Sequence, residues 1–145
     1  MSYRTICVGF LHDDDRNQAV MDTAIQVALT HGAHLTGVHL IPTLNVPAYL
    51  AITFPDDMMT AYYDAADAAG DALRKTFEAH CDSAGIESHE WLGGTRSVLV
   101  TLEELAPVTD LFVLSQQGSG DHDWLLREAS LRLGVPVLAV PDVGQ

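Results

Sequence analysis

The sequence predicts an α/β fold in which a parallel sheet lies between two layers of helices. Short apolar segments, partly β-branched, alternate with amphipathic helical segments along the whole chain. Each strand candidate is bounded by polar or glycine-containing stretches, as is typical of strands buried on both faces. Because strands that alternate with helices form parallel sheets covered on both sides, we expect a three-layer, doubly wound α/β sandwich with five strands.

The first part of the chain supplies a strand, a helix and a second strand. Thr5–Phe10 is a short apolar run that ends at a polar cluster, which indicates a buried strand. A helical pattern from about Asp15 to His31 follows and is stopped by Gly32. His34–Ile41 is the second strand, and Pro42 breaks the segment that leaves it.

A long amphipathic helix is predicted over Asp56–Ala84, with Gly85 ending it. Its apolar side chains recur every three or four residues and are Met59, Tyr62, Ala66, Ala69, Leu73, Phe77 and Cys81. The neighbouring Met58 and Tyr63 add to a Met/Tyr-rich stretch. Helical packing is the favoured explanation of this stretch, and a pocket for a small apolar ligand or a partner surface is the alternative.

The remaining elements complete the alternation. Ile86–Leu92 mixes polar and apolar residues and is typical of a strand near a sheet edge. Gly93, Gly94 and Thr95 are predicted to turn the chain. The elements that follow are a short helix over Ser97–Ala106, a strand over Leu111–Leu114, a last helix, and a strand over Pro136–Val140.

Size and charge limit the class of protein. The 145 residues fit one domain, 1–145, and no linker or internal repeat divides them. The 20 acidic and 7 basic residues give a formal charge of −13, which disfavours nucleic acids and anionic membranes as partners. No run of apolar residues is long enough for a membrane helix. We expect a cytoplasmic protein.

No catalytic motif emerges from the sequence. It contains no GxSxG elbow, P-loop or HExxH pattern. Cys7 and Cys81 form no CxxC pair and are expected to be buried thiols. His34 and His39 are an odd number of residues apart on one strand, so they should point to opposite faces. The protein is therefore not expected to be an enzyme.

Four segments together resemble the universal stress protein (UspA-like) family. They are RTICVGF before an acidic helix start, THGAHLTGVHLIP, the long helix ending in AG, and DLFVLSQ with GVPVLAVP. The resemblance covers nearly the whole chain. It implies an adenine nucleotide alpha hydrolase-like fold with strand order 3-2-1-4-5, a role in the stress response, and dimerisation through the last strand, Pro136–Val140.

Many members of that family bind ATP through an acid after the first strand and a G-x2-G-x9-G-[ST] loop after the fourth. Here Leu11 stands where the acid is expected. A motif started at Ser115 matches only at Gly118, because Glu128 and Ala129 replace the final pair. About five residues are deleted relative to the family, a shortening that resembles the N-terminal half of tandem members.

The first and fourth strands should open a crevice at their carboxyl ends, where doubly wound folds bind ligands. Aspartates after both strands would repel a triphosphate there. As an alternative role, these aspartates could hold a divalent cation together with His12 and His122. A role as N-caps and solvated helix starts is the favoured explanation of the aspartates. Trp124 is a candidate to close the crevice. The ligand-binding candidates are Leu11, His12, Asp13, Val38, Ser115, Gly118, Ser119 and Gly120.

Two functional hypotheses follow from these patterns. In the first, the chain is a universal stress protein-like domain that acts by interaction, as a homodimer or with a second such domain, and nucleotide binding is weak or lost; it needs no cofactor. In the second, the chain is a member that still binds ATP, or slowly hydrolyses it, at a loop remodelled around Gly118-Ser119-Gly120. Co-purifying adenine nucleotide would separate the two.

Overall fold

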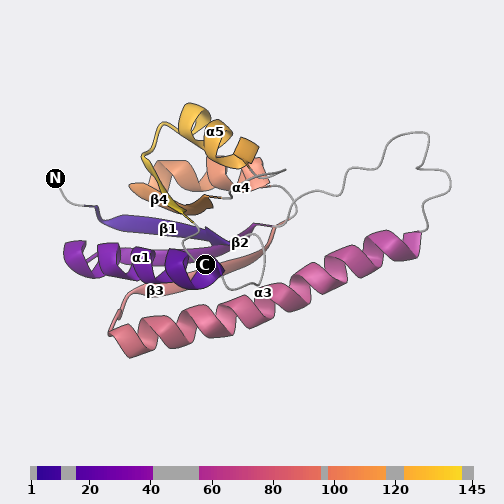
Figure 1. Cartoon of the computed structure of the whole chain (residues 1–145), viewed down its shortest axis with the longest axis horizontal. Helices are drawn as coiled ribbons and strands as arrows, with labels where there is room; N and C mark the ends of the chain where they lie inside the picture. Colours follow the sequence, from indigo (N-terminus) through magenta and orange to yellow (C-terminus); the bar gives the residue numbers. More distant parts are fainter. Residues whose placement is uncertain (1–2, 11–15, 41–55, 96–97, 117–122, 142–145) are drawn as a thin grey trace.

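The computed structural model describes residues 3–10, 16–40, 56–95, 98–116 and 123–141 of the chain. A five-stranded parallel sheet runs in the order β3-β2-β1-β4-β5 (Figure 1). This order confirms the predicted fold class. The strands are β1 (Thr5–Phe10), β2 (His34–Leu40), β3 (His89–Thr95), β4 (Leu111–Gln116) and β5 (Val137–Pro141). The helices are α1 (Arg16–His31), α3 (Asp56–Ala84), α4 (Val98–Leu105) and α5 (Asp123–Arg132), with a short 3-10 turn over Ala106–Val108.

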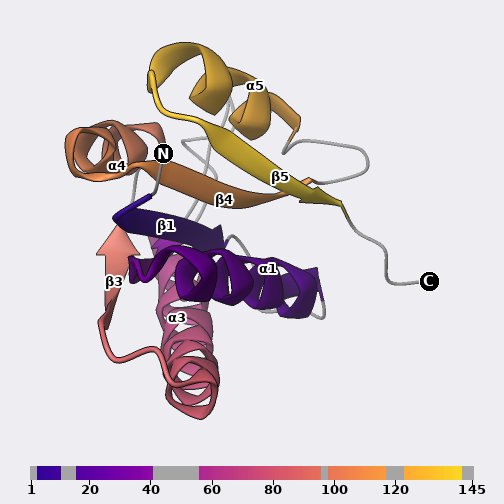
Figure 2. The same ribbon diagram turned by 90° about the vertical axis from the view of Figure 1, so that its left-hand side faces the viewer.

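The sheet separates two layers of helices. Helices α1 and α3 lie on one face and α4 and α5 on the other (Figure 2). Successive strand residues therefore contribute to two different cores. Ile6 and Val8 of β1 pack in the core beneath α1 and α3, whereas Cys7 packs with Phe112 and Leu102 beneath α4 and α5. Burial of apolar side chains on both faces explains why the strands have such continuous apolar sequences.

Strand β3 differs from its predicted bounds. It begins at His89 rather than Ile86, because Gly85 and Ile86 form the C-terminal cap of α3. Gly85 adopts a positive φ of 79° and the Ile86 N–H donates to the Cys81 carbonyl, which caps the helix. The strand then continues to Thr95, so the glycines at 93 and 94 do not form the predicted turn. The edge position predicted for this strand is confirmed.

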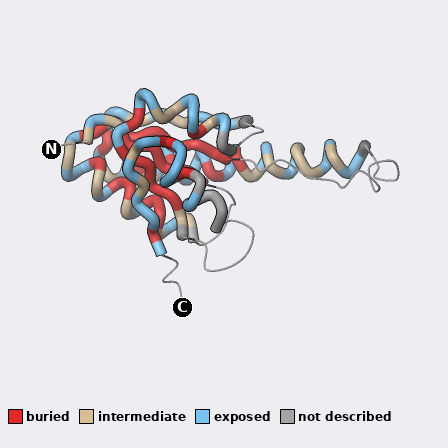
Figure 3. The backbone as a smooth tube through the Cα atoms, turned by 90° about the horizontal axis from the view of Figure 1, so that it is seen from above, coloured by how far each residue is buried: buried red, intermediate tan, exposed pale blue. Residues whose placement is uncertain are grey.

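Helix α3 is only half incorporated into the core. Its carboxyl-terminal part buries Leu73, Phe77 and Cys81, while its amino-terminal part projects beyond the sheet (Figures 1 and 3). Met58 keeps 52% of its surface exposed, and Tyr62 and Tyr63 are half-buried. Core packing was therefore the wrong interpretation for this Met/Tyr-rich stretch, since the sheet does not extend beneath it.

Asp110 links the start of β1 to the segment before β4. One carboxylate oxygen, Oδ2, accepts hydrogen bonds from the backbone N–H groups of Arg4 at 2.7 Å and Thr5 at 3.1 Å. The Asp110 N–H in turn donates to the Thr5 carbonyl at 2.8 Å. The two backbone donors, that of Arg4 first, hold the pKa of Asp110 below its ordinary value. The ionised carboxylate thus favours the folded state.

We expect the Asp110→Ala variant to melt below the wild type at neutral pH and to approach it under acid conditions. A carboxyl whose folded-state pKa is depressed contributes its stability above the unfolded pKa, about 3.9, and loses it as pH falls through the folded value. Melting temperatures measured between pH 7 and pH 2.5 check this expectation. A constant difference across that range would contradict it.

Candidate functional site

The predicted crevice lies where the central strands β1 and β4 end side by side. Two of its eight candidate residues, Val38 and Ser115, fall within the described parts of the chain. Val38 is buried in the core beneath α4 and α5, whereas Ser115 shares the strand periodicity of Val113, which faces α1. These two side chains therefore lie on opposite faces of the sheet and do not converge. Leu11, His12, Asp13, Gly118, Ser119 and Gly120 lie outside the described residues, as does His122 of the proposed cation site.

Ala129 is the residue at which a nucleotide-loop motif started at Ser115 would end. In the structure this residue lies inside α5. Its side chain is fully buried in the core beneath α4 and α5, and its carbonyl accepts the Leu133 N–H. A buried methyl group in the body of a helix offers no donor to a phosphate. The side chain of Trp124 lies outside the described set.

The two cysteines are buried and free, as predicted. Burial, reinforced by the nearby Glu90 carboxylate, raises the pKa of the Cys7 thiol to about 12. Burial, with the charges of Asp82 and Glu78, raises the pKa of Cys81 to about 11. Both sulfurs therefore remain protonated thiols at physiological pH, and neither has the lowered pKa of a catalytic nucleophile.

We expect both thiols to resist a disulfide reagent such as DTNB in the native protein at pH 8. An ordinary exposed cysteine, with a pKa near 8.5, is about a quarter thiolate at that pH, so labelling should be orders of magnitude slower here. Release of thionitrobenzoate, followed with and without denaturing guanidinium, measures the difference. Rapid native labelling of either cysteine would contradict the burial.

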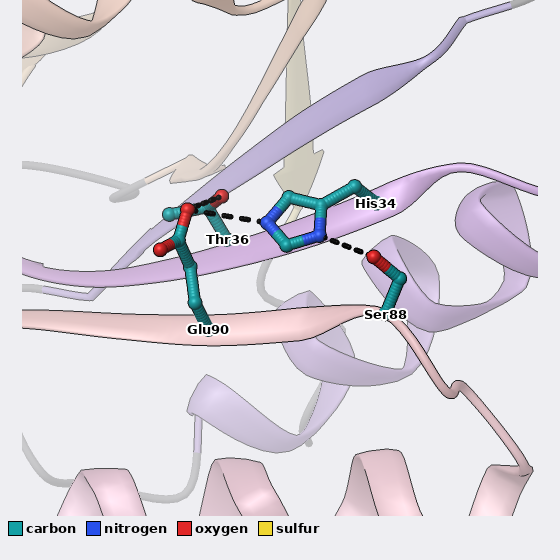
Figure 4. Close-up of polar contacts among 4 residues, drawn as sticks. All are labelled: His34, Thr36, Ser88 and Glu90. Carbon is teal, nitrogen blue, oxygen red and sulfur yellow. Dashed lines mark hydrogen bonds and ion pairs between the residues drawn. The ribbon is translucent and has the colours of Figure 1, made fainter.

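Four polar side chains bridge β2 to the edge strand β3: His34, Thr36, Ser88 and Glu90 (Figure 4). Ser88 Oγ lies 2.6 Å from His34 Nδ1, and His34 Nε2 lies 3.2 Å from Glu90 Oε1. The Thr36 hydroxyl donates to the same Glu90 oxygen at 3.3 Å. An imidazole protonated on Nε2 would satisfy both contacts of His34. We call these residues the His34 cluster.

The His34 cluster has the order of a nucleophile, a base and a carboxylate. Catalysis would need an oxyanion donor and a substrate cavity beside Ser88. The cluster lines neither of two cavities, of about 540 and 620 Å³, that the described residues form. The contacts join side chains of β2 to Glu90 of the edge strand and to Ser88 just before it. They also confirm that His34 and His39 face opposite sides, since His39 packs against α3.

A cavity of about 540 Å³ opens between α3 and the carboxyl-terminal parts of β2 and β3. Helix α3 lines it with Asp67, Gly70, Asp71 and Arg74. The strands contribute His39, Trp91 and Gly93. Polar and aromatic groups converge here on a hollow of the size that small ligands occupy.

Sequence reasoning missed this cavity because its parts come from separate elements. The polar side chains on α3 look like an ordinary solvent-exposed face, and Trp91 like a packing residue. One signal was available in Gly70, a glycine in the middle of a helix. A Cβ at Gly70 would lie 2.7 Å from Nδ1 of His39, so only glycine permits this approach of α3 to β2.

The fold defines a class of protein, the doubly wound α/β domains with strand order 3-2-1-4-5. Among solved structures, it matches those of universal stress proteins. A universal stress protein in complex with cAMP is 24% identical, with TM-score 0.69 and coverage of 98% of this chain and 99% of that one. UspA from Lactobacillus plantarum is 17% identical, with TM-score 0.67 and coverage of 97% and 99%.

A third similar structure is a universal stress protein family protein from Arabidopsis thaliana with AMP bound, 15% identical, with TM-score 0.62 and coverage of 97% and 93%. These likenesses confirm the universal stress protein fold for this chain. No protein-family sequence model matches the chain, and no curated protein sequence does either.

Two further findings concern classes of site. Within the described ranges, no group of three or more histidine, cysteine, aspartate or glutamate side chains is placed to hold a metal ion. Among the helices that the structure describes, none is long and apolar enough to cross a membrane.

Proposed function

We propose that this chain is a universal stress protein-like domain that acts in the stress response through protein interaction, with nucleotide binding weak or lost. The fold, shared with solved universal stress proteins, supports the family assignment. We further propose that the domain is not an enzyme, needs no cofactor and resides in the cytoplasm. Its charge of −13 and its lack of catalytic motifs favour these proposals.

The observation that carries the loss of nucleotide binding is the position of Ala129. Helix α5 begins at Asp123, so the last part of the family's phosphate loop would fall inside a helix. Ala129, where that loop would end, is fully buried in the core. Together with Leu11 in place of the acid after β1, two separate parts of the ATP site have changed. A remodelled loop that still binds ATP remains the competing hypothesis.

Purified protein separates these two hypotheses. We expect no adenine absorbance in the supernatant of the denatured protein, and no saturable heat on titration with ATP and Mg²⁺ up to 1 mM. A nucleotide-binding universal stress protein, prepared in parallel, serves as the positive control. Stoichiometric adenine nucleotide after purification, or micromolar affinity for ATP, would contradict the proposal.

Strand β5 is the surface that we propose for interaction with a second copy or a second domain of this type. Among the strands that the structure describes it is at one edge of the sheet, so one row of its backbone groups has no strand beside it there. Leu138 and Ala139 are exposed on this strand, and Leu138 keeps 37% of its surface accessible. An exposed apolar edge is suited to pairing across a two-fold axis.

Light scattering of paired variants tests this interface. We expect a dimer for the wild type and a monomer for Leu138→Arg, because a buried charge at the centre of a two-fold interface has no partner. Leu131→Arg is the matched control, since Leu131 is 77% exposed on α5 and should leave the dimer intact. A monomeric wild type, or equal effects of both arginines, would overturn the β5 interface.

A further inference from the structure

The His34 cluster is separate from the crevice predicted at β1 and β4. His34 is the first residue of β2 and pairs with Thr5, the first residue of β1. Because the sheet is parallel, the cluster lies at the amino ends of the strands, opposite the carboxyl ends where the crevice was predicted. Ser88 is exposed, and the His34 side chain keeps 31% of its surface accessible. A small molecule in solution can therefore reach both groups.

The contacts of Glu90 determine which ring nitrogen of His34 carries the proton. Oε1 of Glu90 lies 3.2 Å from His34 Nε2 and also accepts the Thr36 hydroxyl at 3.3 Å. Thr36 is 4% exposed, so this second contact holds the carboxylate from within the protein. An ionised carboxylate offers only acceptors, so Nε2 must face it with an N–H. In the neutral imidazole Nδ1 is then an acceptor, and it lies 2.6 Å from Ser88 Oγ (Figure 4).

This arrangement is that of an activated serine. A serine hydroxyl attacks poorly unless a neighbouring base removes its proton, and a third group that orients the base strengthens the effect. Here Nδ1 of His34 is placed as the base and Glu90 as the orienting group. The backbone N–H of Ser88 donates no hydrogen bond to the other residues that the structure describes. It can therefore donate to an oxyanion that forms beside Oγ.

We propose that Ser88 is a site of covalent acylation by small activated esters, with His34 as the base and Glu90 as the residue that positions its ring. Oγ of Ser88 bonds to the acyl carbon, and the bond from that carbon to the alcohol oxygen of the donor breaks. The hydroxyl proton passes to His34 Nδ1 and then to the leaving alcohol. Each chain takes up one acyl group, so the step is compatible with a domain that is not an enzyme. It depends on neither nucleotide binding nor the β5 interface.

A fluorophosphonate probe tests the nucleophile, because it traps an activated serine as a stable phosphonate ester with loss of fluoride. We expect the native protein to gain one adduct, which peptide mass spectrometry places on Ser88. Ser88→Ala should gain none, whereas Ser83→Ala, the matched control at an exposed serine of α3, should react at the wild-type rate. No adduct on the native protein, or an equal yield from protein unfolded in guanidinium, would overturn the proposal.

The ester p-nitrophenyl acetate tests acyl transfer itself, since each transfer releases one nitrophenolate. We expect acid-quenched wild type to carry an acetyl group on Ser88. Nitrophenolate release should fall at least tenfold in Ser88→Ala and in His34→Gln, because each variant lacks one of the two reacting groups. Release that persists in Ser88→Ala would assign the reaction to another side chain and refute the site.

Glu90→Gln tests the positioning residue. The variant keeps the size of the side chain but loses its charge, and it should slow acetylation of Ser88 at least tenfold. Thr36→Val is the matched control, because it removes the other hydrogen bond to the same Glu90 oxygen and should change the rate less than threefold. Circular dichroism and melting temperatures confirm folding of each variant. Equal slowing in both variants would give Glu90 a structural role alone and refute its positioning of His34.

Discussion

Replacing Phe77 with alanine should destabilise the domain by about 3–5 kcal/mol. Phe77 is fully buried at the point where α3 enters the core. Its ring meets Phe10 edge-on at 6.4 Å, His89 at 6.1 Å and Trp91 at 5.5 Å, so one deletion leaves a cavity bordered by three rings. Because these neighbours belong to β1 and β3, they cannot collapse onto the space without shifting the sheet.

Urea unfolding followed by circular dichroism measures the Phe77→Ala effect. The m-value should stay constant while the midpoint falls, since the surface exposed on unfolding changes little. Leu29→Ala is the control: this side chain is 46% exposed on α1 and its loss should cost less than about 0.5 kcal/mol. A cost below about 1 kcal/mol for Phe77→Ala would show that α3 is not anchored at this position.

The alternation of strands and helices was predictable because each element has a local signature. β-branched apolar runs marked the strands, and positive-φ glycines at 32 and 85 followed α1 and α3 where expected. The order of the strands came from the resemblance to a family and is confirmed. The first residue of β3 was not predictable, because Ile86 is held in the cap of α3 by a hydrogen bond from its N–H to the Cys81 carbonyl, and the sequence does not show this bond.

The cavity and the His34 cluster could not be predicted for a related reason. Both depend on the register between β2 and β3, which pairs Thr36 with Glu90 and Gly37 with Trp91. A single sequence contains the residues but not this pairing. Core packing was wrongly predicted for the amino-terminal part of α3 because an amphipathic stripe shows only that a helix has an apolar face. The stripe does not show how far the sheet beneath the helix extends.

The Gly37→Ala substitution is expected to have the second large effect on stability. Two opposing contributions, conformational entropy and steric overlap, decide its sign. In the interior of a strand, Gly→Ala ordinarily stabilises by about 0.5–1 kcal/mol, since alanine loses less conformational freedom on folding. At Gly37 a Cβ would lie 2.7 Å from Trp91 Cε3, 2.9 Å from Cζ3, and 3.0 Å from Phe77 Cε1. Rigid rings held by their neighbours do not yield easily, and overpacking costs about 1–3 kcal/mol. We expect steric overlap to dominate, so Gly37→Ala destabilises.

A double-mutant cycle with Trp91→Leu isolates the cause. Once the indole is gone, two of the three close contacts disappear, so Gly37→Ala should become neutral or slightly stabilising. The coupling measured by urea unfolding should exceed about 1 kcal/mol. Additive effects would mean that the Trp91 ring shifts easily away from Gly37. The Trp91 side of the cavity between α3, β2 and β3 would then be adjustable rather than fixed in position by the sheet.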